Sequence, residues 1–320
     1  MVIGATIKFN RRGYAVLTAV LLIFLYFHFR RVPNRNQELI SLVSLLQTSI
    51  QAAEEGGKLV VATRNYLTVQ LKGKTHEGMD DSVTTADFLS HCIMERIITS
   101  AYPSVQFISE EKNVACDPGG DFVLLGKPEI KIPDIQVKAS DVTVWIDPLD
   151  ATHEYTEKLY EYVTTMVCVA VKGEPILGVI HNPFKKTLSW AIVGRGVSNN
   201  LKEPLIKDKG LNKKVIISRS HSGTIKEVLG KVCKDCEIVI AAGAGYKALK
   251  VAKGDVDAYL HITAIKKWDV CAGHAILNAL GGKVTTKHGK KLLYGNDSDV
   301  IIQDGLIATL KDHGFFVDKL

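Results

Sequence analysis

A sixteen-residue apolar segment, residues 14–29, sets the first constraint on how this 320-residue chain can fold, because it contains no Asp, Glu, Lys or Arg. In a helix, sixteen residues extend about 24 Å, slightly less than the hydrocarbon core of a bilayer. Arginines flank the segment on both sides, and no small-x-small cleavage site follows it. We therefore expect an uncleaved transmembrane signal anchor over 14–29, with a tail at 1–13 and a stem at 30–36. A cleaved signal peptide is the alternative.

The excess charge of the chain lies around the same segment. Residues 1–36 contain six Lys and Arg and no acidic residue, whereas the whole chain has a net charge of +6. Residues 37–320 therefore hold 34 basic and 34 acidic residues. This balance excludes the basic surface that is typical of a protein binding nucleic acid. A hydrophobic fraction of 46% instead predicts a folded domain with a sizeable core over 37–320.

The spacing of apolar residues divides that domain into two halves, 37–195 and 196–320, and both mix helices with strands. In the first half we expect helices at 37–66 and 83–101, an exposed loop at 72–81, an irregular insertion at 112–141, and strands at 105–109, 142–146, 164–171, 176–180 and 188–193. In the second half we expect strands at 215–217, 237–241, 258–261 and 300–302, and helices at 222–233, 245–253, 271–280 and 304–319. Alternation of this kind predicts an α/β or α+β protein with layered sheets and helices.

The six cysteines are too few for a disulfide scaffold at this length. Cys233 and Cys236 form a single C-x-x-C pair, which cannot complete a zinc site alone, so we expect a helix end that carries two thiols. One N-x-S sequon, at Asn296, is a candidate glycosylation site and is compatible with a lumenal domain.

The segment with the most chemical information is Trp145-Ile-Asp-Pro-Leu-Asp-Ala-Thr152, in which an apolar strand ends in two carboxylates three residues apart. An Asp at the end of a buried strand is unfavourable unless it caps a helix, pairs with another group or binds a cation. Asp147 and Asp150 can share hard cations such as Mg²⁺, and the amides of Ala151 and Thr152 at a helix start can bind an anion. A structural turn in which Asp150 caps the helix explains the same residues, and both interpretations stay open on this segment alone.

Three further segments carry acids of the same kind. Glu110 follows an apolar strand in Ser109-Glu-Glu111, Asp269 begins a helix in Lys267-Trp-Asp269, and Asp87 lies at a helix start in Thr84-Thr-Ala-Asp87. Each has an ordinary explanation as a solvated acid or a helix cap. Together with Asp147 and Asp150 they supply enough carboxylates for two or three Mg²⁺ ions.

These four segments, in this order and spacing, resemble the inositol monophosphatase superfamily of Mg²⁺-dependent, lithium-sensitive phosphomonoesterases. The resemblance extends from about residue 37 to the end of the chain and implies alternating α-β-α-β-α layers. It implies that Glu110, Asp147 and the carbonyl of Leu149 hold one Mg²⁺, that Asp147, Asp150 and Asp269 hold a second, and that a third lies near Glu110 and Asp87. It also implies that Thr152, oriented by Asp87, positions the attacking water, while the amides of Ala151 and Thr152 bind the phosphate.

Other residues indicate which class of substrate the chain binds. Inositol phosphatases carry a Glu shortly before the Trp-Asp pair, and residues 260–267 contain no carboxylate. Two segments, Ser218-Arg-Ser-His221 and Gly243-Ala-Gly-Tyr-Lys247, resemble the substrate segments of 3'(2'),5'-bisphosphate nucleotidases. The resemblance implies that Ser218, His221, Gly243 and Lys247 contact the nucleotide. A Lys and a His suit a second phosphate, and Gly allows close approach of a ribose or base.

Ala151 stands where most of the superfamily has Gly. Together with the N-terminal apolar segment, this Ala resembles the Golgi-resident branch of the nucleotidases. Membership of that branch implies a single-pass type II Golgi membrane protein with a cytosolic N-terminus and a lumenal catalytic domain. It implies that the protein hydrolyses 3'-phosphoadenosine 5'-phosphate to AMP and phosphate in support of sulfation. It also implies a homodimer.

Three alternatives accompany this interpretation. An inositol monophosphatase or another small phosphomonoesterase would use the same fold. A type II Golgi glycosyltransferase would share the anchor and could use the Asp-x-Asp pairs at 255–257 or 297–299. A catalytically dead scaffold is the third, and the complete set of acids argues against it.

Overall fold

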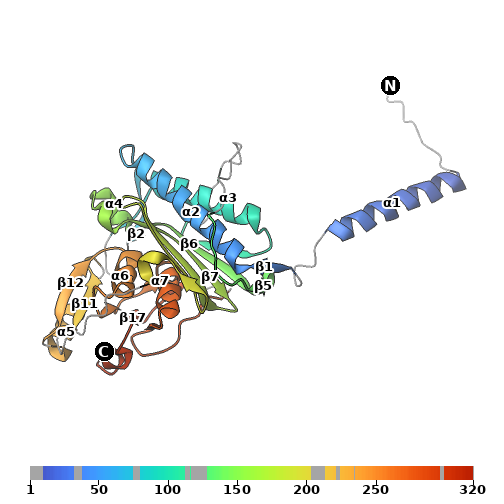
Figure 1. The fold of residues 1–320 in the computed structure, drawn as a ribbon. Helices are drawn as coiled ribbons and strands as arrows, with labels where there is room; N and C mark the ends of the chain where they lie inside the picture. Colours follow the sequence, from blue (N-terminus) through green and yellow to red (C-terminus); the bar gives the residue numbers. More distant parts are fainter. Residues whose placement is uncertain are drawn as a thin grey trace.

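The computed structural model describes residues 10–31, 38–74, 80–111, 116, 128–202, 213–220, 224–233, 235–295 and 299–319. The expected substrate residue His221, the sequon residue Asn296 and most of the expected tail and stem lie outside these residues. The folded domain contains two main sheets with helices on both sides of each (Figure 1).

The first sheet has six strands in the order β10-β9-β8-β7-β6-β4. Their bounds are β4 Gln106–Ser109, β6 Val142–Asp150, β7 Thr164–Val171, β8 Glu174–Asn182, β9 Thr187–Ile192 and β10 Gly196–Val197. All neighbours are antiparallel except β4 and β6, which are parallel. The predicted hairpin of β7 and β8 is confirmed. It turns through Lys172 (φ 51°) and Gly173 (φ 81°), and positive φ at both central residues is typical of the tightest hairpin turns.

Two helices, α2 (Leu42–Thr63) and α3 (Thr85–Ala101), pack against each other and against one face of the first sheet (Figure 1). The helix predicted from residue 37 begins later, because residues 39–41 form β1 (Leu39–Ser41), paired with β5 (Gln136–Lys138). Ser41 then caps α2, and its hydroxyl accepts the N–H of Ser44 at 3.0 Å. An N-cap serine of this kind fixes where a helix starts.

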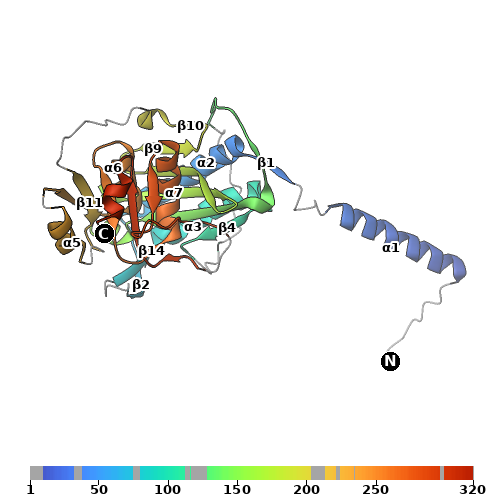
Figure 2. The same cartoon turned by 90° about the horizontal axis from the view of Figure 1, so that it is seen from below.

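The second sheet has five strands in the order β12-β11-β13-β17-β15. Their bounds are β11 Lys214–Ser218, β12 Glu237–Ala241, β13 Ala258–His261, β15 Lys283–Thr285 and β17 Leu306–Thr309. Apolar side chains of α5 (Ile225–Val232) and α8 (His313–Val317) pack on its outer face. The other face contacts α6 (Ala244–Ala252) and α7 (Lys267–Ala279), which lie between the two sheets (Figures 1 and 2). The predicted α-β-α-β-α layers are therefore present.

The helix expected over 304–319 is wrong in its first part. Residues 306–309 form the antiparallel strand β17 between β13 and β15, and α8 follows only at 313. A short apolar run is compatible with a buried strand as well as with a helix. The strands available to pair with it therefore determine which of the two it forms. Gly305, directly before β17, has φ 63°, and a Cβ there would lie 1.9 Å from the carbonyl oxygen of His261.

The exposed loop expected at 72–81 is also wrong in part, because its two sides belong to the hairpin β2 (Val69–Lys74) and β3 (Asp80–Thr84). A further pair joins β14 (Ile265–Lys266) to β16 (Ile301–Ile302). The remaining helical segments are α4 (Thr152–Thr156) and the short 3-10 turns at 139–141, 160–162 and 199–201.

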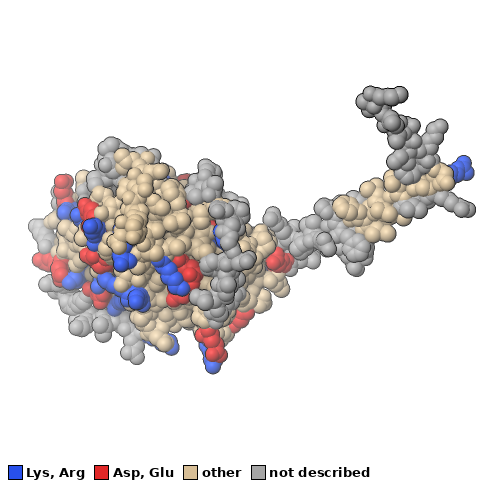
Figure 3. Space-filling model, turned by 90° about the horizontal axis from the view of Figure 1, so that it is seen from above, with Lys and Arg blue, Asp and Glu red and all other residues tan. Residues whose placement is uncertain are grey.

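Residues Arg11–Arg31 form helix α1, which stands apart from the rest of the described chain in Figures 1 and 2. Among the helices of the described residues, none combines the length and the apolarity that a membrane crossing needs. The transmembrane helix expected over 14–29 is therefore not supported by the structure. On the face of the folded domain seen in Figure 3, basic and acidic side chains are interspersed, in keeping with the balanced charge of residues 37–320.

All six cysteines form disulfides: Cys92–Cys116, Cys168–Cys271 and Cys233–Cys236. Cys233 lies at the end of α5, as predicted, but the expectation of two thiols there is wrong. The Cys168–Cys271 bond joins β7 to α7, and Gly178 lies on the neighbouring strand opposite Cys168. A Cβ on Gly178 would lie 2.2 Å from the carbonyl oxygen of Ala272, so only glycine lets α7 approach the first sheet this closely.

Candidate active site

Strand β6 delivers both acids of the predicted motif into the interior. All nine of its residues are buried, and the register to β7 shifts between Asp147 and Asp150. Pro148 lies in this irregularity, where its lack of an N–H costs no ladder hydrogen bond. Its carbonyl oxygen accepts the hydroxyl of Ser90 on α3 at 2.7 Å. The bulge thus places two carboxylates on one stretch of strand.

Glu110 lies beside Asp147 because β4 runs parallel to β6. Ser109 pairs with Ile146, and the N–H of Glu110 donates to the carbonyl oxygen of Ile146 at 3.3 Å. Glu110 also acts electrostatically on Asp147 and raises its pKa. The structure therefore brings together these two predicted metal ligands.

Asp87 and Thr152 meet from separate helix starts, in the arrangement that the family resemblance implied. The Asp87 carboxylate accepts the N–H of Thr84 at 2.8 Å and its hydroxyl at 2.6 Å, which completes a capping box at the start of α3. Its other oxygen lies 2.9 Å from the Thr152 hydroxyl, which also lies 3.0 Å from the Leu149 carbonyl oxygen. Because a hydroxyl has one proton, Thr152 donates to one of these oxygens at a time.

Ala151, between the motif and α4, has φ 70° and ψ 46°. This left-handed conformation is unfavourable for any residue with a Cβ, and glycine adopts it without strain. The strained residue joins Asp150 to Thr152, so the sharp change of direction at Ala151 is what carries the chain from the strand into α4.

Asp150 is bound to the start of α6. One of its oxygens accepts the N–H of Ala244 at 3.0 Å, and the other accepts the N–H of Gly245 at 2.8 Å and the hydroxyl of Thr164 at 3.0 Å. The capping role that was one interpretation of Asp150 is therefore present, although the capped helix is α6 and not α4. Gly243 precedes these amides with φ 68°, and a Cβ there would lie 2.6 Å from the carbonyl oxygen of Tyr162.

Asp269 enters from the first turn of α7, where it accepts the N–H of Lys266 at 3.1 Å. Burial raises the pKa of Asp269 to about 7, and the negative charge of Asp150 adds to this effect. Asp150 and Asp269 therefore lie close enough to repel each other. Since they come from segments that the sequence separates by more than a hundred residues, only the packing of α7 on the first sheet brings them together.

Asp147 is at the centre of this acidic cluster, which we define as Asp87, Glu110, Asp147, Asp150 and Asp269. Burial is the largest cause that raises its pKa well above the usual range, and the charges of Glu110, Asp150, Asp269 and Asp87 follow in that order. Acids that destabilise one another's charged form in the interior need a positive counter-charge if they are to be ionised together.

Lys247, on α6, supplies one such charge. It is buried, and burial lowers its pKa to about 8 against the opposing effect of Asp150, Glu154 and Asp269. Its ammonium group lies 5.1 Å from the centre of the Tyr259 ring, a cation–π distance. The predicted substrate residue Lys247 is thus near enough to Asp150 and Asp269 to interact electrostatically with these acids of the cluster.

Ser218 lies on the same side, at the end of β11. Its hydroxyl lies 3.1 Å from His261 Nδ1, and the other ring nitrogen lies 3.0 Å from the Thr263 hydroxyl. The next residue, Arg219, forms ion pairs with Glu157 and, at 3.7 Å, with Glu154. The sequence did not identify His261. Its position at the end of the buried strand β13, within the region 260–267 that lacks carboxylates, is the signal that could have found it.

Glu111 is a second residue that the sequence did not assign. It is 4% exposed, its N–H donates to the Ser109 hydroxyl at 3.2 Å, and its charge raises the pKa of Asp87. Two adjacent acids after a strand would ordinarily point to opposite sides, so the sequence gave no reason to bury both. Glu111 extends the negative field of the cluster towards α3.

The Asp-x-Asp pairs considered for a glycosyltransferase do not belong to this cluster. Asp255 accepts the ammonium group of Lys250 at 2.9 Å, and Asp257 accepts the N–H of Lys214 at 2.6 Å. Asp299, the described member of the second pair, accepts the N–H of Ile301 at 2.9 Å. These acids have local structural partners.

Taken together, a set of buried and half-buried carboxylates at strand and helix ends, bordered by a Lys, defines a site of the kind that binds divalent cations and phosphate esters. The family that these features define can be named: the chain belongs to the inositol monophosphatase family, whose model matches residues 41–314. It is a phosphatase.

Curated relatives support this assignment along most of the chain. "Putative inositol monophosphatase 3" of Drosophila melanogaster is 43% identical over 99% of this chain and 95% of its own length. "Golgi-resident adenosine 3',5'-bisphosphate 3'-phosphatase" of Mus musculus is 44% identical over 88% of this chain and 82% of its own length.

Solved structures share the fold. The extragenic suppressor protein SuhB from Bartonella henselae is 21% identical with a TM-score of 0.63, and covers 85% of this chain and 95% of its own. CysQ from Bacteroides thetaiotaomicron, described as a bacterial member of the inositol monophosphatase family, is 22% identical with a TM-score of 0.60, and covers 84% of this chain and 98% of its own. At these identities the likeness concerns the fold.

Proposed function

We propose that the chain hydrolyses the 3'-phosphate of adenosine 3',5'-bisphosphate to AMP and inorganic phosphate, in a Mg²⁺-dependent and lithium-sensitive reaction. The observation that carries the proposal is the meeting of Asp147, Asp150 and Asp269 beside Lys247. In this reaction water attacks phosphorus, the bond from phosphorus to the 3'-oxygen breaks, and the 3'-oxygen takes up a proton. The name of the mouse relative, an adenosine 3',5'-bisphosphate 3'-phosphatase, supports this substrate.

The donors of the acidic cluster fit Mg²⁺. They are oxygen atoms, Asp87, Asp147 and Asp150 are buried while Glu110 and Asp269 are half-buried, and the acids repel one another without a cation. Following the family pattern, Glu110, Asp147 and the Leu149 carbonyl would hold one ion, Asp147, Asp150 and Asp269 a second, and a third would lie near Glu110 and Asp87. When bound, Mg²⁺ neutralises phosphate charge and makes a bound water more acidic.

The chain's own residues have separate tasks in this proposal. Thr152, held by Asp87, orients the attacking water through its hydroxyl oxygen. The hydroxyl itself donates its hydrogen bond to Asp87 or to the Leu149 carbonyl oxygen. The amides of Ala151 and Thr152 bind the phosphate as it is attacked, and their aim depends on the left-handed conformation of Ala151.

The side with Lys247 recognises the nucleotide. A buried ammonium group suits a second phosphate, and Ser218 lies on the neighbouring strand end with a hydroxyl that can bind the same ligand. Gly243, directly before the first residue of α6, contacts the nucleotide through its backbone in this proposal. His221, which we also predict to contact the nucleotide, lies outside the described residues.

A phosphate monoester of inositol is the second candidate substrate. The names of the Drosophila and Xenopus tropicalis relatives favour it, since both are inositol monophosphatases. The absence of a carboxylate from residues 260–267 favours the nucleotide, because recognition of inositol hydroxyls in this family uses an acid there.

The decisive experiment measures phosphate release by the full chain from adenosine 3',5'-bisphosphate and from inositol 1-phosphate, with Mg²⁺ and with added lithium. We expect faster, lithium-inhibited release from the nucleotide. Preference for inositol 1-phosphate would overturn the substrate, and absence of release from both would overturn the phosphomonoesterase proposal. We expect Asp147→Asn to abolish release, whereas the matched variant Asp255→Asn, which removes an acid paired with Lys250, keeps it.

The cellular setting is part of the proposal. The mouse relative is named as Golgi-resident, which supports a Golgi location with the catalytic domain in the lumen. The anchor over 14–29, the type II orientation, the homodimer and glycosylation of Asn296 stay predictions. Carbonate extraction of membranes, protease protection of the domain in sealed vesicles, and digestion with a glycosidase test the first, second and last of these.

A further inference from the structure

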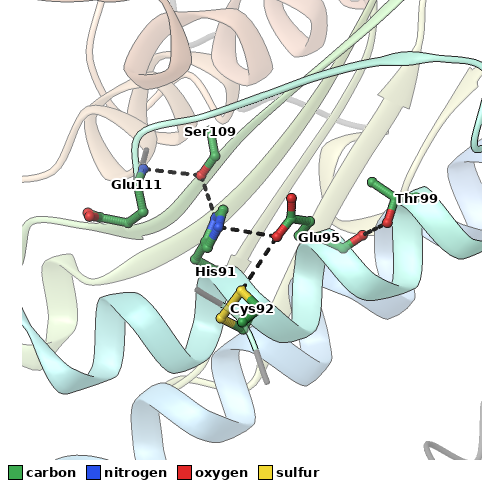
Figure 4. Close-up of a disulfide and its surroundings, with 7 residues drawn as sticks. His91, Cys92, Glu95, Thr99, Ser109 and Glu111 are labelled. Carbon is green, nitrogen blue, oxygen red and sulfur yellow. Dashed lines mark hydrogen bonds and ion pairs between the residues drawn. A yellow bond between two sulfur atoms is a disulfide. The ribbon is translucent and has the colours of Figure 1, made fainter. Parts of the chain in front are cut away.

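A second group of potential metal ligands lies on α3, outside the acidic cluster. His91 and Glu95 are four residues apart and therefore share one face of the helix (Figure 4). Cys116 lies near them because it forms a disulfide with Cys92. One ligand atom from each of His91, Glu95 and Cys116 lies within 4.8 Å of the other two. The site proposed for the phosphatase reaction uses none of these side chains.

The two distances from the Glu95 carboxylate match those around a tetrahedral ion. His91 Nε2 lies 3.4 Å from Glu95 Oε2, and that oxygen lies 3.5 Å from Cys116 Sγ. With metal bonds of about 2.0 Å to nitrogen and oxygen and about 2.3 Å to sulfur, tetrahedral zinc separates N from O by about 3.3 Å and O from S by about 3.5 Å. Glu95 Oε2 is therefore already spaced from the nitrogen and from the sulfur as in one zinc site, and the nitrogen and sulfur lie within 4.8 Å of each other.

The histidine is also oriented as a ligand. Its Nδ1 lies 2.8 Å from the hydroxyl of Ser109, so Nε2 is the nitrogen that faces Glu95 (Figure 4). A ring whose far nitrogen is held by a neighbour is the usual arrangement of a zinc-binding histidine. Burial lowers the pKa of His91 to about 4, so the imidazole is neutral at physiological pH. The Glu95 side chain is 37% exposed and gives an ion access from solvent.

We propose that reduction of the Cys92–Cys116 disulfide creates a zinc site made by His91, Cys92, Glu95 and Cys116. A dithiol reduces the bond with two electrons and two protons and is itself oxidised to a cyclic disulfide. The two cysteine thiols then release their protons to solvent as their sulfurs bind the ion. In the oxidised chain the sulfurs are bonded to each other, and the site has too few ligands.

This site differs in chemistry from the acidic cluster. Nitrogen and sulfur donors select zinc, whereas an all-oxygen set selects Mg²⁺. Cobalt reports the difference directly, because a thiolate bound to Co²⁺ gives a sulfur-to-metal charge-transfer absorption that carboxylates cannot give. The probe therefore distinguishes this site from the acidic cluster, and its readout does not depend on enzymatic activity.

The experiment titrates Co²⁺, and then Zn²⁺, into the full chain. All samples carry Cys233→Ser and Cys236→Ser, which removes the other pair of cysteines close in sequence. One sample is reduced with a dithiol that is then removed under anaerobic conditions, and the other stays oxidised. We expect the charge-transfer band in the reduced sample only, with displacement by one equivalent of Zn²⁺.

Variants test the individual ligands. Cys116→Ser should abolish the band, and Glu95→Gln should raise the Kd for Co²⁺ about tenfold or more, whereas the exposed helix acid variant Glu227→Gln should leave it unchanged. The proposal is overturned by absence of a band in the reduced chain, by a full band in Cys116→Ser, or by an unchanged Kd in Glu95→Gln. Since Glu95→Gln removes no disulfide, it keeps the test valid if Cys116→Ser fails to fold.

Discussion

Asp150 and Gly245 lie 95 residues apart, and the carboxylate of the first accepts the N–H of the second at 2.8 Å. The same carboxylate accepts the N–H of Ala244, so it caps α6 while it belongs to the acidic cluster. Asp150 thus connects the strand that carries the acids to the helix that carries Lys247. One residue therefore serves both the stability of the domain and the proposed chemistry.

Replacement Asp150→Asn should affect both properties. One oxygen becomes an amide that faces an N–H donor, so we expect a loss of about 1–3 kcal/mol in the free energy of unfolding. Loss of the charge should lower kcat/KM by about 100-fold or more, because a proposed metal ligand is neutralised. Urea unfolding and phosphate release measure the two effects. The surface variant Asp255→Asn is the control, and equal activity in both variants would contradict the role of Asp150.

Ala151 is strained, and the strain can be removed. We expect Ala151→Gly to raise the free energy of unfolding by about 0.5–1 kcal/mol, because glycine avoids the cost of the left-handed conformation, part of which is offset by its greater freedom in the unfolded chain. Phosphate release should stay equal or increase. Ala248→Gly, inside α6, should act in the opposite direction and destabilise by about 1 kcal/mol. A destabilised Ala151→Gly would show that the methyl group is needed.

Gly243 combines positive φ with close packing. In Gly243→Ala the new Cβ would lie 2.6 Å from the carbonyl oxygen of Tyr162 and 3.1 Å from Asp150 Oδ2. We expect a loss of about 2–4 kcal/mol in stability and of at least about tenfold in kcat/KM. Gly194→Ala is a matched control, since Gly194 has φ 70° and no atom within 4 Å of the new Cβ. Its cost should be limited to the backbone strain, with activity unchanged.

His274 should make the fold sensitive to acid. Burial, with a contribution from Lys291, lowers its pKa from 6.5 to about 3. Between these values the unfolded chain binds a proton that the folded chain does not, so stability is complete above about pH 6.5 and falls as the pH decreases to about 3. From pH 7 to pH 5 this one group should cost about 2 kcal/mol.

The variant His274→Gln tests this assignment by urea unfolding at both pH values. Glutamine can still bond to the Tyr294 hydroxyl, which lies 2.9 Å from His274 Nδ1. We expect the variant to lose about 2 kcal/mol less than the parent chain between pH 7 and pH 5. An identical pH dependence in both proteins would assign the acid sensitivity to other groups.

The sequence predicted the features that depend on neighbouring residues. The strand before Asp147, the hairpin of β7 and β8, and the position of Asp87 at a helix start all follow from local patterns, and the structure confirms them. The convergence of Asp147 and Asp269 was expected only through the resemblance to a family. Nothing in the spacing of the residues brings the two segments together.

The sequence could not predict contacts made by packing across the layers. Asp150 caps α6 because the second half of the domain places that helix over β7, and no local pattern identifies the partner of a cap 94 residues away. Strand β17 was predicted as helix because its four buried residues have no distinguishing period. The disulfide partners likewise depend on which elements lie together.

The bond between Cys168 and Cys271 has a consequence for biosynthesis. Cys92 and Cys116 are 24 residues apart and can pair soon after both leave the ribosome, whereas Cys168 must wait for another 103 residues. Both partners end up buried between a strand and the helix that carries Asp269. Oxidation of this pair therefore has to occur late, after synthesis of α7 and before the interior closes to an oxidising enzyme.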